Sequence, residues 1–265
     1  MSALRALWHH RSSILSMTTA DIRGRYLGSV LGALWLVIHP AVMIAVYILV
    51  FSAILGARLP TSVGGEFSYG LYLCAGVLPW GLFHETVARG QGLFTEYGAL
   101  MKNSRLSSTV PLASMLLSAA FNFVLPFLIL LGILLALDAF PGWSLLGLVP
   151  VFLVQQALAG GLGILLGVAN VLIRDFGQAT PVILQLWFWG TPIVYPPTIL
   201  PEATRGWIEL LNPMYVVMEN YHAILVYQAK PDWAGLVAVA VLGAVLLLVA
   251  RAALRRTREE LVDML

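Results

Sequence analysis

Charged residues are scarce in this sequence. Asp, Glu, Lys and Arg make up 11% of the 265 residues, whereas an ordinary soluble domain carries roughly 25%. Hydrophobic residues make up 60%, and the mean hydropathy is +0.88. This composition excludes an ordinary soluble domain and predicts a chain that lies in a lipid bilayer.

Lysine and cysteine are almost absent, and each absence excludes a class of protein. Cys74 is the single cysteine, so no disulfide can form within the chain. Neither lysine, Lys102 or Lys230, closes a G-x-x-x-x-G-K-[ST] loop, whose backbone amides cradle nucleotide phosphates. If nucleotide hydrolysis powers this protein, we expect another chain to bind the ATP and magnesium, with no cofactor bound here. The net charge of +2 does not indicate a nucleic-acid partner, and we expect none.

The sequence also lacks a recognisable metal site. The stretch "HETVA", residues 84–88, approaches the H-E-x-x-H zinc signature, but Ala88 stands where the second histidine belongs. His9 and His10 are adjacent, so on a helix they point about 100 degrees apart and are poorly placed to share a metal. We predict no metal site and no enzyme activity.

Ionisable residues are rare inside the apolar stretches, which argues against an ion-coupled transporter, because such proteins keep acids and bases in their spans. The exceptions are Glu85 and Arg89, spaced i, i+4 so that they can pair on one helix face. We interpret them as a self-neutralised pair, with gating as the alternative. Arg174 and Asp175 form a short turn in which Asp175 is predicted to cap the next helix, with a gate or partner contact as the alternative.

Six apolar windows predict an all-α, polytopic membrane protein with six transmembrane helices. A transmembrane helix needs about 20 mostly apolar residues. Five windows of about this length contain no Asp, Glu, Lys or Arg: 26–57, 106–137, 139–173, 176–201 and 233–250. A sixth, 67–84, is shorter and rich in glycine. One membrane domain, residues 1–265, accounts for the whole chain.

Positive charges predict the orientation of these spans. If the N-terminus is cytoplasmic, the cytoplasmic segments hold Arg5, Arg11, Arg23, Arg25, Arg89, Lys102, Arg105, Arg174, Arg251, Arg255, Arg256 and Arg258. Only Arg58, Arg205 and Lys230 then lie outside. Because Lys and Arg near span ends set topology, both termini are predicted to be cytoplasmic.

The segment before the first span is predicted to be an amphipathic interface helix within residues 1–25. Its apolar side chains recur with helical period on one stripe: Leu4, Leu7, Trp8, Ile14, Leu15 and Ile22. Such a basic, one-sided helix is typical of the membrane surface. A frayed tail is the alternative.

Two links between spans carry further predicted helices. The cytoplasmic link, 95–110, fits a short helix over 96–102. The external link, 196–231, contains Asn212 as a predicted N-cap and Pro213 at the first helical position. The helix that follows is too short to cross, so we expect external capping helices that lie in the interface or re-enter the membrane.

Small residues and prolines modify the first and fifth windows. Gly28 and Gly32, at i, i+4 spacing, predict a close helix contact, either within the subunit or with a neighbour. Pro40 is expected to kink the first window, and Pro181 and Pro192 the fifth.

The first and fifth windows contain aromatic residues and no charged ones. The candidates for the wall of a conduit are Tyr47, Phe51, Trp187, Phe188 and Trp189. Ring faces offer wide contact area, which suits the C–H surfaces of sugars. Membrane anchoring is the alternative, because Trp and Tyr gather at both interfaces of a bilayer.

Five stretches follow one another along the chain in a characteristic order: "RYLGSVLGALWLVIHPAVMIAVYILVFS" (25–52), "LYLCAGVLPWGLF" (71–83), "NVLIRD" (170–175), "TPIVYP" (191–196) and "LNPMYVV" (211–217). This ordered set resembles the ABC-2 type permeases that export bacterial surface polysaccharides, most nearly the O-antigen exporters. The resemblance implies a homodimer in the bacterial inner membrane, with each subunit docked on a separate nucleotide-binding ATPase subunit. It also implies that the first and fifth spans line a conduit for a lipid-linked glycan.

The same resemblance implies how ATP-driven closure reaches the spans. The interface helix and the cytoplasmic link would contact the ATPase, and the link supplies Glu96, Tyr97, Leu100 and Lys102 as coupling candidates. Other cargoes, namely teichoic acid, capsule, lipid or drug, are alternatives. A membrane-bound transferase that uses a lipid-linked donor is a further alternative, although the external acids Glu202, Glu209, Glu219 and Asp232 are scattered.

Overall fold

A computed structural model describes residues 8–25, 31–54, 59, 64–103 and 109–256. Within these residues every regular element is a helix, which confirms the predicted all-α class. The main helices are α2 (Arg11–Gly24), α3 (Trp35–Tyr47), α4 (Ser68–Asn103), α5 (Thr109–Ala136), α6 (Leu148–Leu172), α7 (Asp175–Trp189), α8 (Glu202–Leu211), α9 (Pro213–Leu225) and α10 (Trp233–Arg256). A π-helix, Ile48–Ile54, continues α3. Gly28 and residues 1–7 lie outside the described residues.

Among the residues that the structure describes, four helical segments are long and apolar enough to cross a membrane, so the chain is a multi-pass membrane protein. They are Trp35–Ser52, Val110–Ala136, Gly142–Leu172 and Trp233–Arg256. Of the other two predicted windows, 67–84 lies almost entirely in α4, and 176–201 consists of α7 and the irregular segment that follows it. α4 mixes glycine, tyrosine and charged residues into its length, and α7 has only 15 residues.

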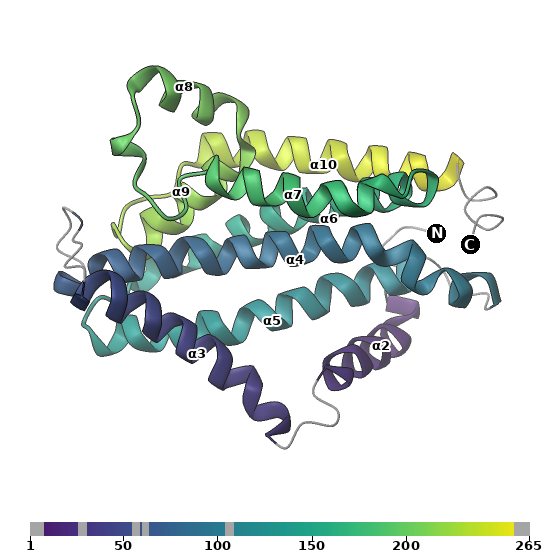
Figure 1. Cartoon of the computed structure of the whole chain (residues 1–265), viewed down its shortest axis with the longest axis horizontal. Coiled ribbons are helices and arrows are strands. Elements are labelled where there is room, and N and C mark those ends of the chain that lie inside the picture. The colour runs from purple at the N-terminus through teal and green to yellow at the C-terminus, as the bar shows by residue number, and fades with distance from the viewer. Residues whose placement is uncertain (1–7, 26–30, 55–58, 60–63, 104–108, 257–265) are drawn as a thin grey trace.

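The helices run along one long axis, with different elements gathered at each end (Figure 1). The C-terminal ends of α4 and α10 and the turn between α6 and α7 lie at one end, and α2 lies toward it. α8 and α9 lie at the other end. α3 runs obliquely to α4 and α5, and its N-terminal end lies farther from α4 than its C-terminal end does (Figure 1).

α4 is long enough to project from a bilayer. Its 36 residues measure about 54 Å at 1.5 Å per residue, against a hydrocarbon core of roughly 30 Å. The predicted separate helix over 96–102 is wrong, because α4 continues unbroken to Asn103. No proline follows Pro79 within α4, and Gly90 is packed against α6, so nothing interrupts the helix. The coupling candidates therefore lie on the last two turns of α4.

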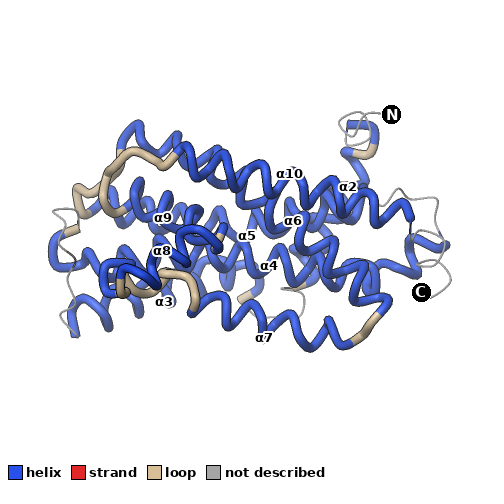
Figure 2. Tube along the Cα trace, turned by 90° about the horizontal axis from the view of Figure 1, so that it is seen from above, coloured by secondary structure: helices blue, strands red, loops and turns tan. Residues whose placement is uncertain are grey.

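α6 lies between α4 and α10, where glycines let the backbones approach closely (Figure 2). A Cβ on Gly163 would come within 3.2 Å of the Cα atoms of Gly90 and Val87 in α4. A Cβ on Gly161 would lie 2.8 Å from the Cβ of Leu246 in α10. Small residues permit this contact in a membrane, where helices associate through van der Waals packing.

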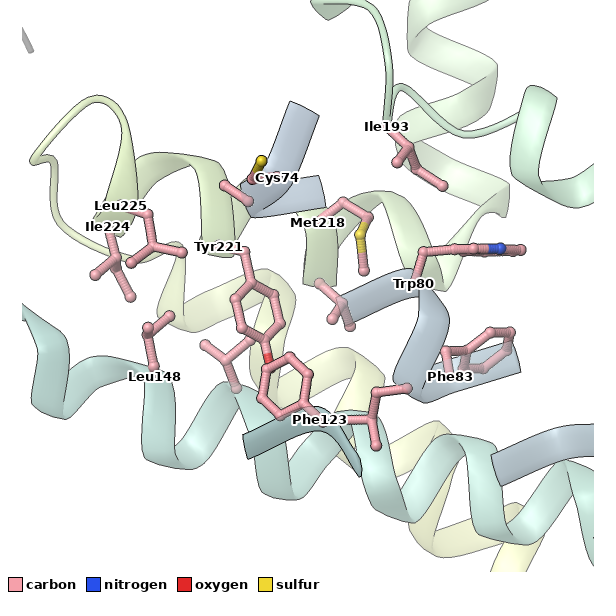
Figure 3. Close-up of a cluster of buried hydrophobic side chains, with 14 of the residues drawn as sticks. Cys74, Trp80, Phe83, Phe123, Leu148, Ile193, Met218, Tyr221, Ile224 and Leu225 are labelled. Carbon is pink, nitrogen blue, oxygen red and sulfur yellow. The ribbon is translucent and has the colours of Figure 1, made fainter. Parts of the chain in front are cut away.

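α9 is short and nevertheless buried. Nine of its residues are buried, and Met218 and Tyr221 join Trp80, Phe83 and Phe123 in the core of Figure 3. These residues come from α9, α4 and α5. The segment between α7 and α10 thus folds back among the long helices at one end of the bundle (Figure 1).

Two predictions about glycine and proline need correction. Gly32 has a φ of +48° and nothing within 4 Å of a Cβ built on it. Its freedom to adopt positive φ serves a turn before α3, and it makes no close contact within the subunit. Pro192 does not kink a helix, because α7 ends at Trp189 and Pro192 lies in the irregular segment that follows. Pro40 and Pro181 lie inside α3 and α7, where the kink expected at each stays a prediction.

Candidate functional site

A network of four charges joins the end of α2 to the middle of α4. Arg25 Nη2 lies 3.5 Å from Asp21 Oδ2 and 3.1 Å from Glu85 Oε1. Arg89 Nη2 lies 2.9 Å from Asp21 Oδ2, and its Nε lies 3.0 Å from Glu85 Oε1. Each arginine therefore bridges both carboxylates, and the four charges cancel. The predicted pair of Glu85 and Arg89 is present, but as half of a larger network.

Asn122 brings α5 into the same network. Its Nδ2 donates to Glu85 Oε1 at 2.7 Å. Nearby, the Thr18 hydroxyl of α2 donates to Ser114 Oγ of α5 at 3.1 Å. The four charged side chains are 22–32% exposed. The pairs are thus better shielded from water than surface ion pairs, whose median contribution is about 0–1 kcal/mol.

Part of the network lies on the wall of a cavity between α3, α4 and α5. This cavity holds about 540 Å³, and Arg25, His39, Glu85 and Asn122 contribute to its lining. A second cavity of about 280 Å³ is also lined by His39, Glu85 and Asn122, together with apolar side chains. Tyr47, one of the conduit candidates, lines this second cavity.

The aromatic candidates on α7 have different environments. Trp187 and Phe188 are half-buried and pack on α4, with ring centroids 5.2 Å from Phe83 and 5.7 Å from Trp80, respectively. Trp189 is 57% exposed. Trp187 and Phe188 therefore help to fix α7 on the bundle, and Trp189 is the aromatic side chain of α7 that faces away from the rest of the subunit.

Phe51 links the first predicted span to the segment after α7. It lies in the π-helix, and its ring stacks on Tyr69 of α4 at 6.1 Å between centroids. The Tyr69 hydroxyl donates to the Val194 carbonyl at 2.8 Å. The same π-helix places Ser52 Oγ where it accepts from the Gly70 amide at 3.0 Å. π-helical turns of this kind occur often at functional sites.

Asn212 is the hub that holds α7 and α9 together. Its Oδ1 accepts from the amides of Met214 and Tyr215 at 3.1 and 3.3 Å, which confirms the predicted N-cap with Pro213 at the first helical position. The same oxygen accepts from the Trp187 indole at 2.8 Å. Its Nδ2 donates to Thr191 Oγ1 at 2.8 Å. One side chain therefore caps a helix and satisfies a half-buried indole.

The remaining candidates lie at the end of the bundle opposite α8. Arg174 and Asp175 are both exposed. The prediction that Asp175 caps α7 is wrong, because Arg174 occupies the N-cap position and Asp175 is the first helical residue. Its negative charge is still favourable in the first turn of a helix. Glu96 and Tyr97 line a cavity of about 200 Å³ together with Asp21 and Arg89 of the network.

Sequence reasoning missed three members of the charge network: Asp21, Arg25 and Asn122. Asp21 and Arg25 are spaced i, i+4 on a predicted helix, and that spacing was the available signal. Asn122 is a lone amide in an apolar window, which gives no indication of its partner. The ion pairs that join the end of α2 to α4 link residues 60 or more positions apart, so no local pattern predicts them.

Among the described residues, no three His, Cys, Asp or Glu side chains come together to hold a metal ion. Two acids at the end of the bundle that holds α8 and α9 make separate hydrogen bonds. Glu209 pairs with Arg205 at 2.8 Å, and that hydrogen bond lowers the pKa of Glu209. Asp232 accepts from the Gly235 amide at the start of α10.

Comparison with known proteins gives one family for most of the chain. The profile described as "ABC-2 type transporter" matches residues 12–226. The chain is 30% identical over 261 residues to the O-antigen export system permease protein RfbA of Myxococcus xanthus, covering 98% of each chain. It is 24% identical over 203 residues to RfbA of Klebsiella pneumoniae, covering 76% of this chain and 75% of that one. It is also 24% identical over 207 residues to the polysialic acid transport protein KpsM of Escherichia coli, covering 75% of each.

Proposed function

We propose that this chain, which belongs to the ABC-2 type transporter family, is the membrane-spanning permease subunit of an ATP-driven exporter of a lipid-linked polysaccharide. The observation that carries the proposal is the similarity to an O-antigen export permease along almost the whole chain. The polysialic acid transporter is a second relative whose named cargo is a polysaccharide. The substrate class is therefore glycan rather than drug or free lipid.

The subunit crosses the bacterial inner membrane six times in this proposal. The four apolar segments supply four spans, and the apolar first half of α4 and the whole of α7 supply the other two. α7 measures about 22 Å, and the irregular segment after it, held by Tyr69 and Asn212, completes the crossing. The arginines at the end of α10 and the turn at Arg174 support cytoplasmic placement of that end of the bundle.

ATP hydrolysis takes place on a separate nucleotide-binding subunit. The chain has no phosphate-binding loop, and the family implies such a partner. The partner contacts the cytoplasmic end, where α2 and the last turns of α4 lie together. Glu96, Tyr97, Leu100 and Lys102 are the proposed coupling residues. The shared cavity of Glu96, Asp21 and Arg89 supports a route from this surface into the charge network.

Two copies of the chain enclose the conduit, and the α3 and α7 of each copy face it. Tyr47, Phe51 and Trp189 are its proposed aromatic contacts, with Trp187 and Phe188 supporting Trp189 from behind. The external helices α8 and α9 close the conduit on the far side and lie in or re-enter the membrane. α8 supports this placement because its exposed apolar side chains share one face: Trp207, Leu210 and Leu211.

The proposal is tested in cells that make a lipid-linked surface polysaccharide. Depletion of the chain should remove that polysaccharide from the surface and cause its lipid-linked form to accumulate inside. Surface labelling with a lectin or antiserum, with extraction of the lipid-linked glycan, measures both quantities. A variant with Glu209→Gln, in an exposed external ion pair, serves as the complementation control. Unchanged surface polysaccharide after depletion, together with an altered lipid or drug content, would transfer the proposal to another cargo.

A further inference from the structure

The exposed faces of α5 and α10 are apolar along their central stretches. On α10 and α5 the exposed side chains from the apolar stretch are aliphatic or aromatic, such as Val241 and Leu248 in α10 and Phe121 and Leu128 in α5. Such faces fit lipid tails. α7 differs, because two of its exposed side chains are amides, Gln178 and Gln185.

The two amides belong to one stripe of α7. Gln178, Val182, Gln185 and Trp189 are spaced by four, three and four residues, so they lie within a narrow sector of the helix. All four are exposed. We call them the amide stripe. Eleven residues separate its ends, which corresponds to about 16 Å along the helix axis.

The amide stripe faces away from the rest of its own subunit. The buried residues of α7, Thr180 and Leu184, lie on the opposite side of the helix. The half-buried Trp187 and Phe188 lie toward that buried side and pack on α4. The packing of α7 on the bundle therefore fixes the direction in which the stripe points.

Lipid is a poor occupant for this face. An amide in a hydrocarbon medium without a hydrogen-bonding partner costs several kcal/mol relative to water, and polar residues within spans are retained for use. The stripe carries no charge, which matches an uncharged, hydroxyl-bearing chain. Amide groups can donate to and accept from hydroxyls, and the exposed indole of Trp189 offers a flat face for C–H surfaces.

We infer that Gln178 and Gln185 are substrate-contact residues, which exchange hydrogen bonds with the hydroxyl groups of the glycan as it passes along α7. This inference rests on the proposed function. The amides form a polar track from near the cytoplasmic end of α7 toward Trp189. The track replaces part of the hydration shell that the glycan loses in the conduit, and it binds no single sugar tightly because the amides are spread along the helix.

Cysteine labelling of the assembled exporter tests whether the stripe faces water and glycan. Cys74 is buried, so the natural thiol gives little background. Gln178→Cys and Gln185→Cys should react with a charged, membrane-impermeant methanethiosulfonate reagent, and accumulated lipid-linked glycan should slow the reaction. Val241→Cys, on the apolar face of α10, is the matched control and should not react. Absence of labelling at both glutamine positions would overturn the inference.

Two outcomes separate this inference from its alternatives. If Gln185→Cys forms a rapid disulfide between two copies, the stripe is a contact between copies and the inference fails. If the exporter carrying the natural chain moves no glycan, the proposed function fails whatever the labelling pattern. A functional exporter with unlabelled cysteines contradicts the glycan track alone.

Export rates supply the second measurement. One hydrogen bond typically changes an equilibrium by about two- to tenfold, so Gln178→Leu combined with Gln185→Leu should slow export roughly tenfold at equal protein level. The pair Gln178→Asn and Gln185→Asn keeps the amides and should restore most of the rate. Equal export by the leucine and asparagine pairs would show that the amides do not act on the glycan.

Discussion

Glu85→Gln is the substitution that tests the charge network most directly. Glu85 Oε1 receives three donors, Arg25 Nη2, Arg89 Nε and Asn122 Nδ2, at 3.1, 3.0 and 2.7 Å. The substitution leaves two guanidinium groups with Asp21 as their remaining carboxylate in the network. Exposed pairs contribute about 0–1 kcal/mol, and breaking a buried pair costs about 3–5 kcal/mol. The side chains here are 22–32% exposed, so we expect a loss of about 1–3 kcal/mol.

Thermal unfolding of the purified chain in detergent measures this loss. For a chain of this size each kcal/mol lowers Tm by roughly 2–4 °C, so Glu85→Gln should lower it by about 2–12 °C. Glu209→Gln is the matched control, because it breaks an i, i+4 pair with Arg205 in which both side chains are more than 40% exposed. We expect the control to change Tm by less than about 4 °C. Equal shifts in both variants would refute the reasoning.

The geometry also predicts the outcome of charge reversal. Glu85→Arg combined with Arg89→Glu would place the new positive charge beside Arg25 and the new negative charge beside Asp21. The double reversal should therefore not restore stability, although an isolated pair would be restored. Recovery of the native Tm by this double variant would show that Asp21 and Arg25 do not belong to the network.

Three further predictions concern packing, capping and the conduit. Gly163→Val should abolish the contact between α4 and α6 and lower the yield of monodisperse protein. Gly132→Ala is the control and should leave the yield unchanged, because nothing lies within 4 Å of a Cβ at Gly132. Equal yields of the two variants would contradict the packing account. Asn212→Ala should lower the free energy of unfolding by about 2–3 kcal/mol, because a helix cap and the partner of an indole are lost together; an unchanged Tm would argue against the hub. Trp189→Ala should leave Tm unchanged and slow export. Trp187→Ala should lower the free energy of unfolding by about 3 kcal/mol. If only Trp187→Ala slows export, Trp189 does not line the conduit.

Much of the fold could be predicted because a membrane-spanning helix requires a long run of apolar residues, which is visible in the sequence. Long uncharged runs predicted the four apolar segments directly, since backbone groups in lipid must be paired within a helix. The same logic failed at the ends of elements. The link over 96–102 has a helical pattern, and nothing in it indicated that the helix is the end of α4.

The candidate site was harder to predict because its contacts are long-range. The local pair of Glu85 and Arg89 followed from spacing, and the cap at Asn212 followed from the residue type before a proline. Asp21 and Arg25 complete the network because of the way α2 packs against α4 and α5. The aromatic residues of α7 looked alike in sequence, and only their packing on α4 separates Trp187 from Trp189.

ATP-driven translocation by the purified components tests the central claim most directly. The chain and a nucleotide-binding partner subunit are reconstituted into vesicles that hold a lipid-linked polysaccharide, and the glycan that reaches the opposite face is measured. We predict ATP-dependent transfer that requires both chains, and no ATP hydrolysis by this chain alone. ATP hydrolysis by this chain without its partner, or no glycan transfer by the complete system, would contradict the account.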